Sequence, residues 1–392
     1  MHFRSFGRLD YAPSALGFGA MRLPVIDGAH DHIDREAARE LLVRAVEGGV
    51  NYVDTAYNYH GGTSEEWLGW ALQGGLRERV RIATKLPSWK VERADDFDRF
   101  LDEQLERLGT GIDFYLLHSL DEDTWRDNVL AHDVLGAAER ALGDGRIGHF
   151  GFSFHDRYEA FELILGGTDL WEFCQIQYNF MDEEHQAGRR GLELAAGRGL
   201  AVVVMEQLRG GQRARPTPAA EEAWAAGLAE LRSAGRRPPG SPVEWALRWL
   251  WDQPEVALLL SGMSTLEQVE QNVRYAARAG VGLMTPEEQA VIARVRDAYR
   301  ESTPIPCTGC KYCLPCPNKV AIPDILDLYN DAVAYADVEG ARTRYTWLDE
   351  ETRAQACTAC GECEDRCPQG IAIAGWLEKA QSFLAVGEDG GG

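Results

Sequence analysis

The sequence lacks any long hydrophobic run. Its apolar runs, such as Leu200 to Met205 and Val256 to Leu260, are far shorter than the ~18 residues of a membrane-spanning helix. The first residues, Met1 to Arg8, contain no apolar segment of the kind that directs export. We therefore expect a cytoplasmic protein with no membrane partner.

The sequence also has no excess of positive charge. Its 40 Lys and Arg residues stand against 62 Asp and Glu residues, which gives a formal net charge of −22. Nucleic acids and anionic membranes bind clustered Lys and Arg, so we expect neither as a partner. Hydrophobic residues make up 45% of the 392 residues, which is enough to bury a full core and excludes a disordered chain.

The nine cysteines are not arranged as scattered disulfide pairs. Cys174 stands alone, and the other eight lie between Cys307 and Cys367. Closely spaced thiols in a cytosolic chain indicate a metal site, whereas scattered pairs would indicate disulfides. Cys174 itself is interpreted as a small, buried apolar side chain on a strand.

The eight clustered cysteines form two runs, each ending in Cys-Pro. The runs are Cys307, Cys310, Cys313 and Cys316, and Cys357, Cys360, Cys363 and Cys367. Both resemble the run of two-cluster bacterial ferredoxins, in which the fourth cysteine ligates the other cluster. In the first run, however, two residues separate Cys313 from Cys316, where the ferredoxin run has three. The resemblance implies one 4Fe-4S cluster on Cys307, Cys310, Cys313 and Cys367, and a second on Cys357, Cys360, Cys363 and Cys316. The alternative is two structural zinc sites.

Strand-like and helix-like segments alternate from about residue 14 to about residue 280. The expected strands are Ala15–Met21, Tyr52–Asp54, Val80–Lys85, Asp113–His118, His149–Ser153, Phe173–Tyr178, Leu200–Met205 and Val256–Ser261. Eight such units over roughly 265 residues are typical of a TIM barrel, although periodicity alone also allows an open doubly wound sheet. We expect a helix over Asp34–Gly48 with Asp34 as its N-cap, and a capping box formed by Ser264 and Glu267.

We expect two domains, a TIM barrel over residues 1–300 and a small, mainly helical ferredoxin-like domain over residues 301–392. Arg209–Pro242, with a helical stretch at Glu221–Ser233, interrupts the alternation and is interpreted as a lid or pocket wall. In the second domain we also expect helices over Asp324–Tyr335 and Leu348–Gln355, and a disordered tail over Gly387–Gly392.

Polar side chains stand at the ends of three consecutive expected strands. Asp54, Lys85 and His118 end these strands, and Tyr59 follows just after the first of them. The carboxyl ends of barrel strands form the catalytic face, so we expect the four residues to meet there. An ammonium held by a carboxylate lowers the pKa of a neighbouring tyrosine, and a histidine can hydrogen-bond a carbonyl oxygen.

These residues make the sequence resemble the aldo/keto reductase family over roughly residues 5–280. The matching segments are DTAYNY with Asp54 and Tyr59, ATKLP with Lys85, and FYLLH with His118. The resemblance implies hydride transfer between a nicotinamide and a carbonyl, with Tyr59 as the acid, Lys85 and Asp54 tuning it, and His118 orienting the substrate. The whole chain resembles the iron–sulfur subgroup of that family, in which a ferredoxin-like domain follows the barrel.

The same resemblance implies a set of residues that contact NAD(P)H. Ser153 and Gln175 would hold the nicotinamide amide, and Met205 stands where the family usually places an aromatic ring. The other positions follow the last strand and are Gly262, Ser264, Gln268 and Asn272. No Lys or Arg stands among them for a 2′-phosphate, so the choice between NADH and NADPH (NADP) is open. Candidates for the substrate pocket are Trp89, His60, Trp125, Phe154 and His155.

The favoured function is therefore an NAD(P)-dependent oxidoreductase acting on a small-molecule carbonyl or alcohol. The alternative is an iron–sulfur enzyme that uses the four residues for acid–base chemistry, or that receives electrons through its clusters from a ferredoxin-like electron-transfer protein. Nicotinamide transfers a hydride and a cluster transfers one electron, and no flavin motif is evident to connect them. A non-catalytic nicotinamide sensor is the third hypothesis.

Overall fold

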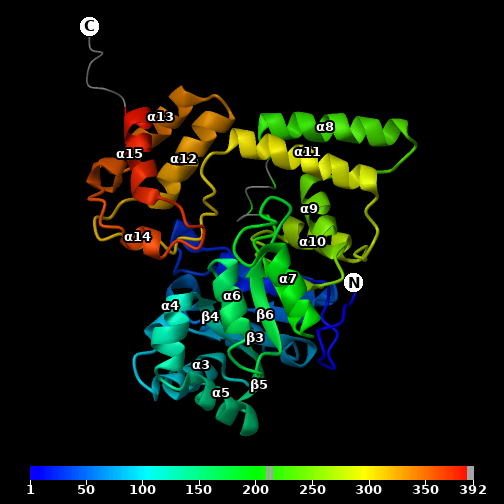
Figure 1. Ribbon diagram of the computed structural model, residues 1–392, viewed down its shortest axis with the longest axis vertical. Helices are drawn as coiled ribbons and strands as arrows, with labels where there is room; N and C mark the ends of the chain where they lie inside the picture. The colour runs from blue at the N-terminus through cyan, green and yellow to red at the C-terminus, as the bar shows by residue number, and fades with distance from the viewer. Residues whose placement is uncertain (209–210, 212–213, 215, 386–392) are drawn as a thin grey trace. The chain divides into compact units, whose positions relative to one another are not determined.

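The computed structural model describes residues 1–208, 211, 214 and 216–385 (Figure 1). Contacts within the described chain group it into two compact units, residues 1–207 with 246–284, and residues 208–245 with 285–392. The boundary predicted near residue 300 falls at the end of a helix of the second unit, α11 (Pro286–Ser302).

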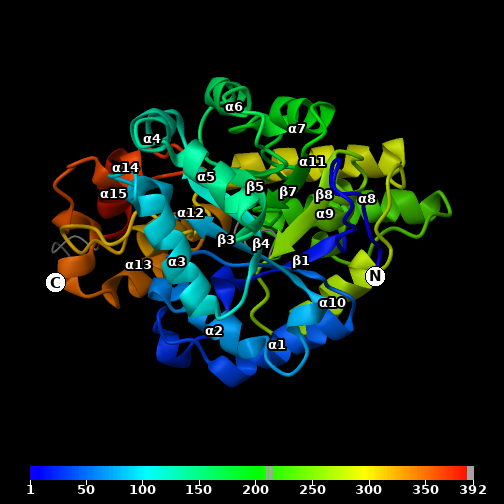
Figure 2. The same ribbon diagram turned by 90° about the horizontal axis from the view of Figure 1, so that it is seen from below.

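The first unit is a closed parallel barrel. Among the described residues, eight strands pair in sequence order, and β1 pairs with β8 to close the ring. The strands are β1 (Leu16–Gly19), β2 (Tyr52–Asp54), β3 (Arg81–Leu86), β4 (Ile112–Leu120), β5 (Ile147–Phe154), β6 (Phe173–Gln177), β7 (Ala201–Met205) and β8 (Val256–Ser261). Figure 2 shows them ringed by helices. The predicted TIM barrel is confirmed, and the open doubly wound sheet is excluded.

The helices of the barrel begin largely where capping chemistry predicts. They are α1 (Arg35–Glu47), α2 (Ser64–Ala71), α3 (Asp96–Leu108), α4 (Glu122–Thr124), α5 (Val134–Gly143), α6 (Tyr158–Leu165), α7 (Gly188–Gly197) and α10 (Leu266–Ala276), while α9 (Pro242–Trp251) crosses the division between the units. Asp34 caps α1 as predicted, because its Oδ1 accepts from the amide of Ala37 at 3.2 Å. The capping box at Ser264 is wrong by one residue, since Thr265 caps α10 and accepts from Gln268 N.

Helices α2 and α3 approach each other so closely that Gly69 has no room for a side chain. A Cβ at Gly69 would lie 2.3 Å from the carbonyl oxygen of Leu108. We expect Gly69→Ala to lower the free energy of unfolding by about 2 kcal/mol, because the backbone of α3 must move. Urea unfolding of the full chain measures this change.

Gly143→Ala is the matched control for this prediction. Gly143 is the last residue of α5, and a methyl group there meets no described atom within 4 Å. Alanine is the better helix former, so this variant should be neutral or up to about 1 kcal/mol more stable. Equal effects of the two substitutions would contradict the close packing of α2 on α3.

The second unit is helical. Its helices are α8 (Pro218–Ser233), α11, α12 (Ile322–Ala334), α13 (Val338–Thr346), α14 (Glu362–Asp365) and α15 (Ile373–Leu384). The stretch predicted at Glu221–Ser233 lies within α8, which runs alongside α11 (Figure 1). The helix predicted over Leu348–Gln355 is wrong, because that segment forms short 3₁₀ turns. The helix forms earlier, where the Asp337 side chain caps α13 by accepting from Gly340 N at 3.0 Å.

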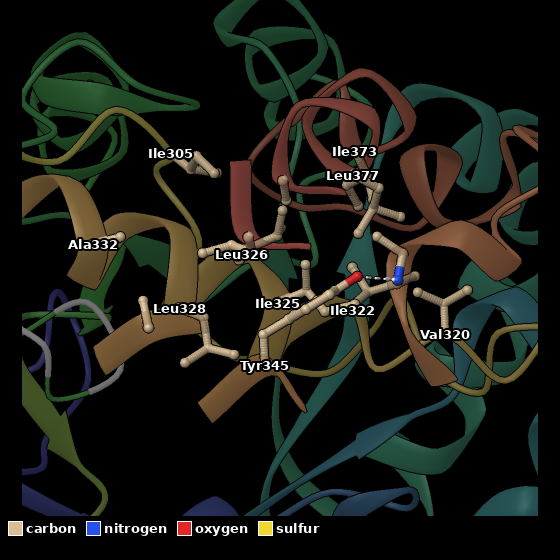
Figure 3. Close-up of a cluster of buried hydrophobic side chains, with 14 of the residues drawn as sticks. Ile305, Val320, Ile322, Ile325, Leu326, Leu328, Ala332, Tyr345, Ile373 and Leu377 are labelled. Atoms are coloured by element: carbon tan, nitrogen blue, oxygen red, sulfur yellow. Dashed lines mark hydrogen bonds between the residues drawn. The ribbon is translucent and has the colours of Figure 1, made fainter. Parts of the chain in front are cut away.

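Apolar side chains from both sides of the cysteine runs share one core in the second unit (Figure 3). Ile322 and Leu326 from α12 pack with Ile373 and Leu377 from α15. The hydroxyl of Tyr345 accepts from the amide of Ala354 at 2.9 Å, which satisfies a buried backbone group. The cysteine-bearing loops are therefore anchored on the starts of two helices that pack together.

Some predictions fall partly or wholly outside the described residues. Arg209, Gly210, Gln212, Arg213 and Arg215 of the interpreted lid lie outside them, as does the tail Gly387–Gly392. The lid therefore stays a prediction. None of the described helices combines the length and the apolar character that crossing a bilayer requires.

Candidate functional site

The inward-facing alternation of the barrel strands carries polar side chains to their carboxyl ends. Tyr52 and Ala83 belong to the barrel core, and Asp54 and Lys85 each follow two residues later on the same face of β2 and β3. In the same way, His118 follows two residues after Leu116, a barrel-core residue, on the same face of β4. Because neighbouring parallel strands end at one edge, these side chains converge.

Lys85 is the centre of the group. Its fully buried ammonium donates to Asp54 Oδ1 at 2.7 Å, to the carbonyl oxygen of Thr55 at 2.7 Å and to Tyr59 Oη at 3.2 Å. An ammonium has three protons, so these contacts use its whole donor capacity. The phenol of Tyr59 is thereby held against a cation that a carboxylate neutralises.

His118 lies beside the tyrosine. The rings of Tyr59 and His118 meet edge to face with their centroids 6.0 Å apart, and the ring of Trp89 lies 5.2 Å from that of His118. The structure thus brings together all four residues of the predicted group and places Trp89 next to them. The position of Trp89, which is 41% exposed, suits contact with a ligand.

Burial dominates the protonation states of this group. It raises the pKa of Tyr59 well above its ordinary value, further helped by the charges of Asp54 and Glu206, and Arg22 opposes them. The sequence predicted a lowered pKa for this phenol, but the ammonium does not outweigh the loss of water. Tyr59 therefore keeps its proton at neutral pH and is able to donate it.

The other members of the group respond to burial in the expected directions. Burial lowers the pKa of Lys85, and the charge of Asp54 raises it again. Burial, followed by the charge of Lys85, holds the pKa of His118 well below its usual value, so the imidazole is neutral at pH 7. A neutral imidazole can donate a hydrogen bond to a substrate oxygen without adding a charge.

The other pocket candidates divide into one that joins this group and three that do not. His155 acts on the charge of His118, and burial lowers the pKa of His155 itself to about 4. His60 hydrogen-bonds the backbone of His30 and Leu23 instead. Phe154, at the end of β5, stacks edge to face on Phe161 of α6, and the ring of Trp125 packs against that of Trp171, so both side chains are used in packing.

The expected nicotinamide residues stand at the ends of the next strands. Ser153 Oγ accepts from Ser119 N at 2.7 Å. Gln175 Nε2 lies 3.4 Å from Met205 Sδ, while the buried Gln175 Oε1 accepts no hydrogen bond from the described residues. A buried, unsatisfied amide oxygen at a strand end can accept a hydrogen bond from the N–H group of a ligand amide.

The predicted positions after β8 form a tight loop at the start of α10. Ser264 N donates to Gln268 Oε1 at 2.8 Å, and Ser264 Oγ donates to the carbonyl oxygen of Arg22 at 2.7 Å. Asn272 Nδ2 donates to Ser261 Oγ at 3.2 Å. A Cβ at Gly262 would lie 3.1 Å from Cβ of Arg22, so this loop is pinned to the one that follows β1.

In the second unit, four of the predicted ligands line one cavity. They are Cys307, Cys310, Cys313 and Cys367, and apolar side chains such as Ile322, Leu326 and Ile373 line the same cavity. Burial raises the pKa of Cys307 to about 11 and that of Cys313 to about 12. Cys367 comes from the second run, so the cavity draws its thiols from both runs.

The other four cysteines are Cys316, Cys357, Cys360 and Cys363. Cys360 is exposed, and Cys316 and Cys357 both act electrostatically on Cys363. Burial, with these charges and that of Glu364, raises the pKa of Cys363 to about 11. In the part of the chain that is described, no three Cys, His, Asp or Glu side chains are close enough together to hold a single metal ion.

The two runs repeat the same local geometry. Gly309 N lies 3.5 Å from Cys307 Sγ, and Ala359 N lies 3.4 Å from Cys357 Sγ. Gly309 and Ala359 both have a positive φ, of 65° and 54°. Each loop thus directs an amide at its first sulfur, as cluster-binding loops require.

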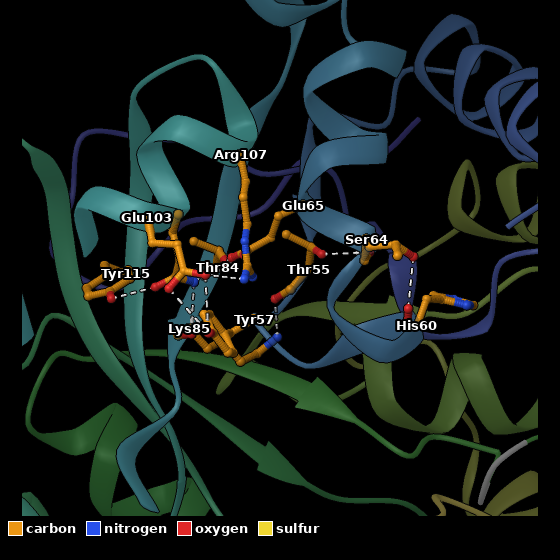
Figure 4. Close-up of polar contacts among 12 residues, drawn as sticks. Thr55, Tyr57, His60, Ser64, Glu65, Thr84, Lys85, Glu103, Arg107 and Tyr115 are labelled. Atoms are coloured by element: carbon orange, nitrogen blue, oxygen red, sulfur yellow. Dashed lines mark hydrogen bonds and ion pairs between the residues drawn. The ribbon is translucent and has the colours of Figure 1, made fainter. Parts of the chain in front are cut away.

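Sequence reasoning missed a polar network behind Lys85, which contains Glu65 and Gln104 (Figure 4). A signal was present. Glu65 shares a helical face with Leu68 and Leu72, and Gln104 shares one with Leu101, so both stand on apolar faces.

The fold and this site define a parallel (β/α)8-barrel protein with ionisable side chains gathered at the carboxyl ends of its strands. Comparison with known proteins matches residues 15–280 to the aldo/keto reductase family, and residues 306–372 to a 4Fe-4S dicluster domain. The chain belongs to the aldo/keto reductase family of oxidoreductases, with a 4Fe-4S dicluster domain after the barrel. Both predicted resemblances are confirmed.

Similar proteins match the barrel part of the chain. The uncharacterized oxidoreductase YqkF of Bacillus subtilis is 26% identical over 299 residues, covering 70% of this chain and 91% of YqkF. The NADH-specific methylglyoxal reductase of Escherichia coli is 23% identical over 308 residues, which cover 68% of this chain and 91% of the reductase. The solved structure of aldo-keto reductase AKR11C1 from Bacillus halodurans (holo form) is 27% identical with a TM-score of 0.59, covering 75% and 96%.

Proposed function

We propose that this chain transfers a hydride between a nicotinamide cofactor and a small carbonyl or alcohol substrate. The observation that carries the proposal is the Lys85 ammonium, which contacts the Asp54 carboxylate at 2.7 Å and the Tyr59 phenol at 3.2 Å. A buried, protonated phenol beside a fixed cation is a suitable acid for a developing alkoxide. Oxidation of NADH by the purified full chain with a panel of aldehydes and ketones tests it.

The residues at the strand ends fit a nicotinamide. Gln175 Oε1 is buried and accepts no hydrogen bond from the described residues, so it is able to accept from a carboxamide. The Ser153 hydroxyl accepts from Ser119 N and would donate its own proton to the carboxamide oxygen. Met205, next to Gln175, would provide an apolar, polarisable surface for the ring.

The residues of the site then have distinct roles. A reduced nicotinamide, when bound, would supply a hydride for the carbonyl carbon. Tyr59 donates its proton to the carbonyl oxygen, and Lys85 stabilises the phenolate that remains. Asp54 keeps Lys85 charged and in place, while the neutral imidazole of His118 donates a hydrogen bond that orients the carbonyl oxygen. In alcohol oxidation the same groups act in reverse.

We expect NADH to be preferred over NADPH. The segment from Ser261 to Asn272 contains no Lys or Arg and includes Glu267 and Glu270, so this segment itself offers no cation to a 2′-phosphate. Since a charged hydrogen bond contributes roughly 1.5–3 kcal/mol, kcat/KM for NADH should exceed that for NADPH by about tenfold or more. Gln268→Arg should raise kcat/KM for NADPH.

Gln271→Arg is the matched control for this cofactor prediction. Gln271 lies on the same helix and donates to Glu267 at 2.7 Å, one turn from the start of α10. The added charge is the same, but it stands away from the loop of Ser264. An equal gain in NADPH use in both variants would show a general charge effect instead of a 2′-phosphate site.

We propose further that the dicluster domain holds two 4Fe-4S clusters, with the ligand sets that the sequence implies. The shared cavity of Cys307, Cys310, Cys313 and Cys367 supports the first set, and the proximity of Cys316 and Cys357 to Cys363 supports the second. Two runs of closely spaced cysteines, each ending in Cys-Pro, suit cubanes, in which each iron takes one thiolate, better than zinc, which usually takes two separated Cys-x2-Cys pairs. Such clusters supply one-electron transfer.

A second candidate function is reduction driven by electrons that enter through the clusters. The exposed position of Cys360 favours it, because a cluster held there is open to an electron-transfer protein. Turnover supported by a reduced ferredoxin in the absence of nicotinamide would favour this second function over the first.

A further inference from the structure

A buried carboxylate lies behind the catalytic lysine, on the side that faces helices α2 and α3 (Figure 4). Glu65, in the first turn of α2, has no exposed surface. Its Oε1 accepts from Thr84 Oγ1 at 2.5 Å and from Gln104 Nε2 at 2.5 Å, and its Oε2 lies 3.3 Å from Arg107 Nη1. A charge buried this completely is costly unless every partner is in place, so its position is closely specified.

Gln104 connects this carboxylate to the backbone of β3. Its Nε2 also lies 3.1 Å from the carbonyl oxygen of Lys85, and its Oε1 accepts from the hydroxyl of Tyr115 at 2.7 Å. Thr84 is the residue before Lys85. The network therefore holds the β3 backbone on both sides of the Lys85 Cα, through the Thr84 side chain before it and through the Lys85 carbonyl oxygen after it.

The charge of Glu65 also reaches the ammonium. The ionisable groups around Lys85 are Asp54 from β2, Tyr59 from the turn after it, Glu65 from α2 and His118 from β4. Burial lowers the pKa of Lys85, and Asp54 and then Glu65 raise it. Burial raises the pKa of Glu65, while the hydrogen bonds from Thr84 and Gln104 and the charge of Arg107 from α3 act to lower it and favour the carboxylate.

We propose that Glu65 is a positioning residue for the carbonyl reduction, which holds the β3 backbone at Lys85 through Thr84 and Gln104 and keeps the Lys85 ammonium protonated beside Tyr59. This inference rests on the proposed function for its role in turnover. Its electrostatic part concerns Lys85 alone and is measured without a substrate.

The chain is suited to a direct measurement, because it contains only five lysines, Lys85, Lys90, Lys311, Lys319 and Lys379. In the full, cluster-loaded chain labelled with ¹³C-lysine, the side-chain NMR signal absent from Lys85→Met is that of Lys85. Glu65→Gln should lower the midpoint of its pH titration by about one pH unit, because a nearby carboxylate favours the charged form. In the pH profile of kcat, the alkaline limb should shift to lower pH by a similar amount.

Glu103→Gln is the matched control. Glu103 also pairs with Arg107 and accepts from Tyr57, but it is partly exposed, and within the described part of the chain its side chain hydrogen-bonds neither Thr84 nor Gln104. It should leave the Lys85 midpoint and the alkaline limb unchanged. A Glu65→Gln midpoint equal to that of the wild type, or an equal shift in Glu103→Gln, would overturn the proposal.

Glu65→Asp separates charge from position and serves if Glu65→Gln does not fold. It keeps the carboxylate but shortens it by one methylene, so the account predicts a wild-type midpoint with a kcat reduced about tenfold or more. An unchanged kcat in this variant would refute the positioning role. A wild type that shows the predicted midpoints but no turnover with any nicotinamide would instead refute the proposed function.

Discussion

Tyr59→Phe should lower kcat for carbonyl reduction by about 10²–10⁴-fold, the usual contribution of a general acid. The variant removes only the hydroxyl that accepts from Lys85 Nζ at 3.2 Å and leaves the ring beside His118. The residues proposed to hold the nicotinamide stand on other strands, so the Kd for NADH should stay within about twofold. Single-turnover kinetics and cofactor fluorescence titration measure the two quantities.

Tyr57→Phe is the control for this prediction. Tyr57 lies two residues earlier and loses the same atom, but its hydroxyl donates to Glu103 at 3.2 Å and its ring packs under Arg107, outside the barrel. Its kcat should remain within about twofold of the wild type, as for surface changes away from a site. Equal kcat in the Tyr59 and Tyr57 variants would remove Tyr59 from the mechanism.

Cys313→Ser should remove one of the two proposed clusters and destabilise the helical unit around it. Cys313 shares its cavity with Ile322, Leu326 and Ile373, the side chains that open the packed helices α12 and α15. We therefore expect cluster binding to contribute directly to the folding of this unit. Iron should fall from about eight to about four per chain, and the visible cluster absorbance by about half.

Cys174→Ala provides the comparison for this variant. Cys174 is fully buried on β6, and burial alone raises the pKa of its thiol. It should retain the full iron content and lose about 1 kcal/mol of stability or less, because one sulfur leaves the core. Zinc in place of iron in anaerobically purified protein, or unchanged iron in Cys313→Ser, would contradict the cluster assignment.

Periodicity predicted the barrel because each of its strands is a short apolar run followed by an amphipathic helix. β2 and β8 have the predicted bounds, Tyr52–Asp54 and Val256–Ser261. The convergence of Asp54, Lys85 and His118 followed from their shared place at strand ends. These features depend on local pattern and on one topological rule, which a single sequence contains.

Other features depend on partners distant in the sequence. Glu65 and Gln104 meet across 39 positions, and neither has a spacing that identifies the other. Thr265 caps α10 in place of Ser264 because Ser264 is used by the backbone of Arg22, 242 positions away. The pKa of Tyr59 is raised mainly because the fold removes water from its hydroxyl. The charged residues near it in the sequence give no information on how completely it is buried.

The measurement that tests the central claim most directly is the transfer of deuterium from NADH labelled at C4 of the nicotinamide. The full chain, with its clusters loaded under anaerobic conditions, is incubated with this NADH and a carbonyl panel, and the alcohols are analysed by mass spectrometry. We expect deuterium on the carbinol carbon with wild-type protein, and far less deuterated alcohol with Tyr59→Phe. Alcohol formed without deuterium, and only when a reduced ferredoxin is supplied, would contradict it.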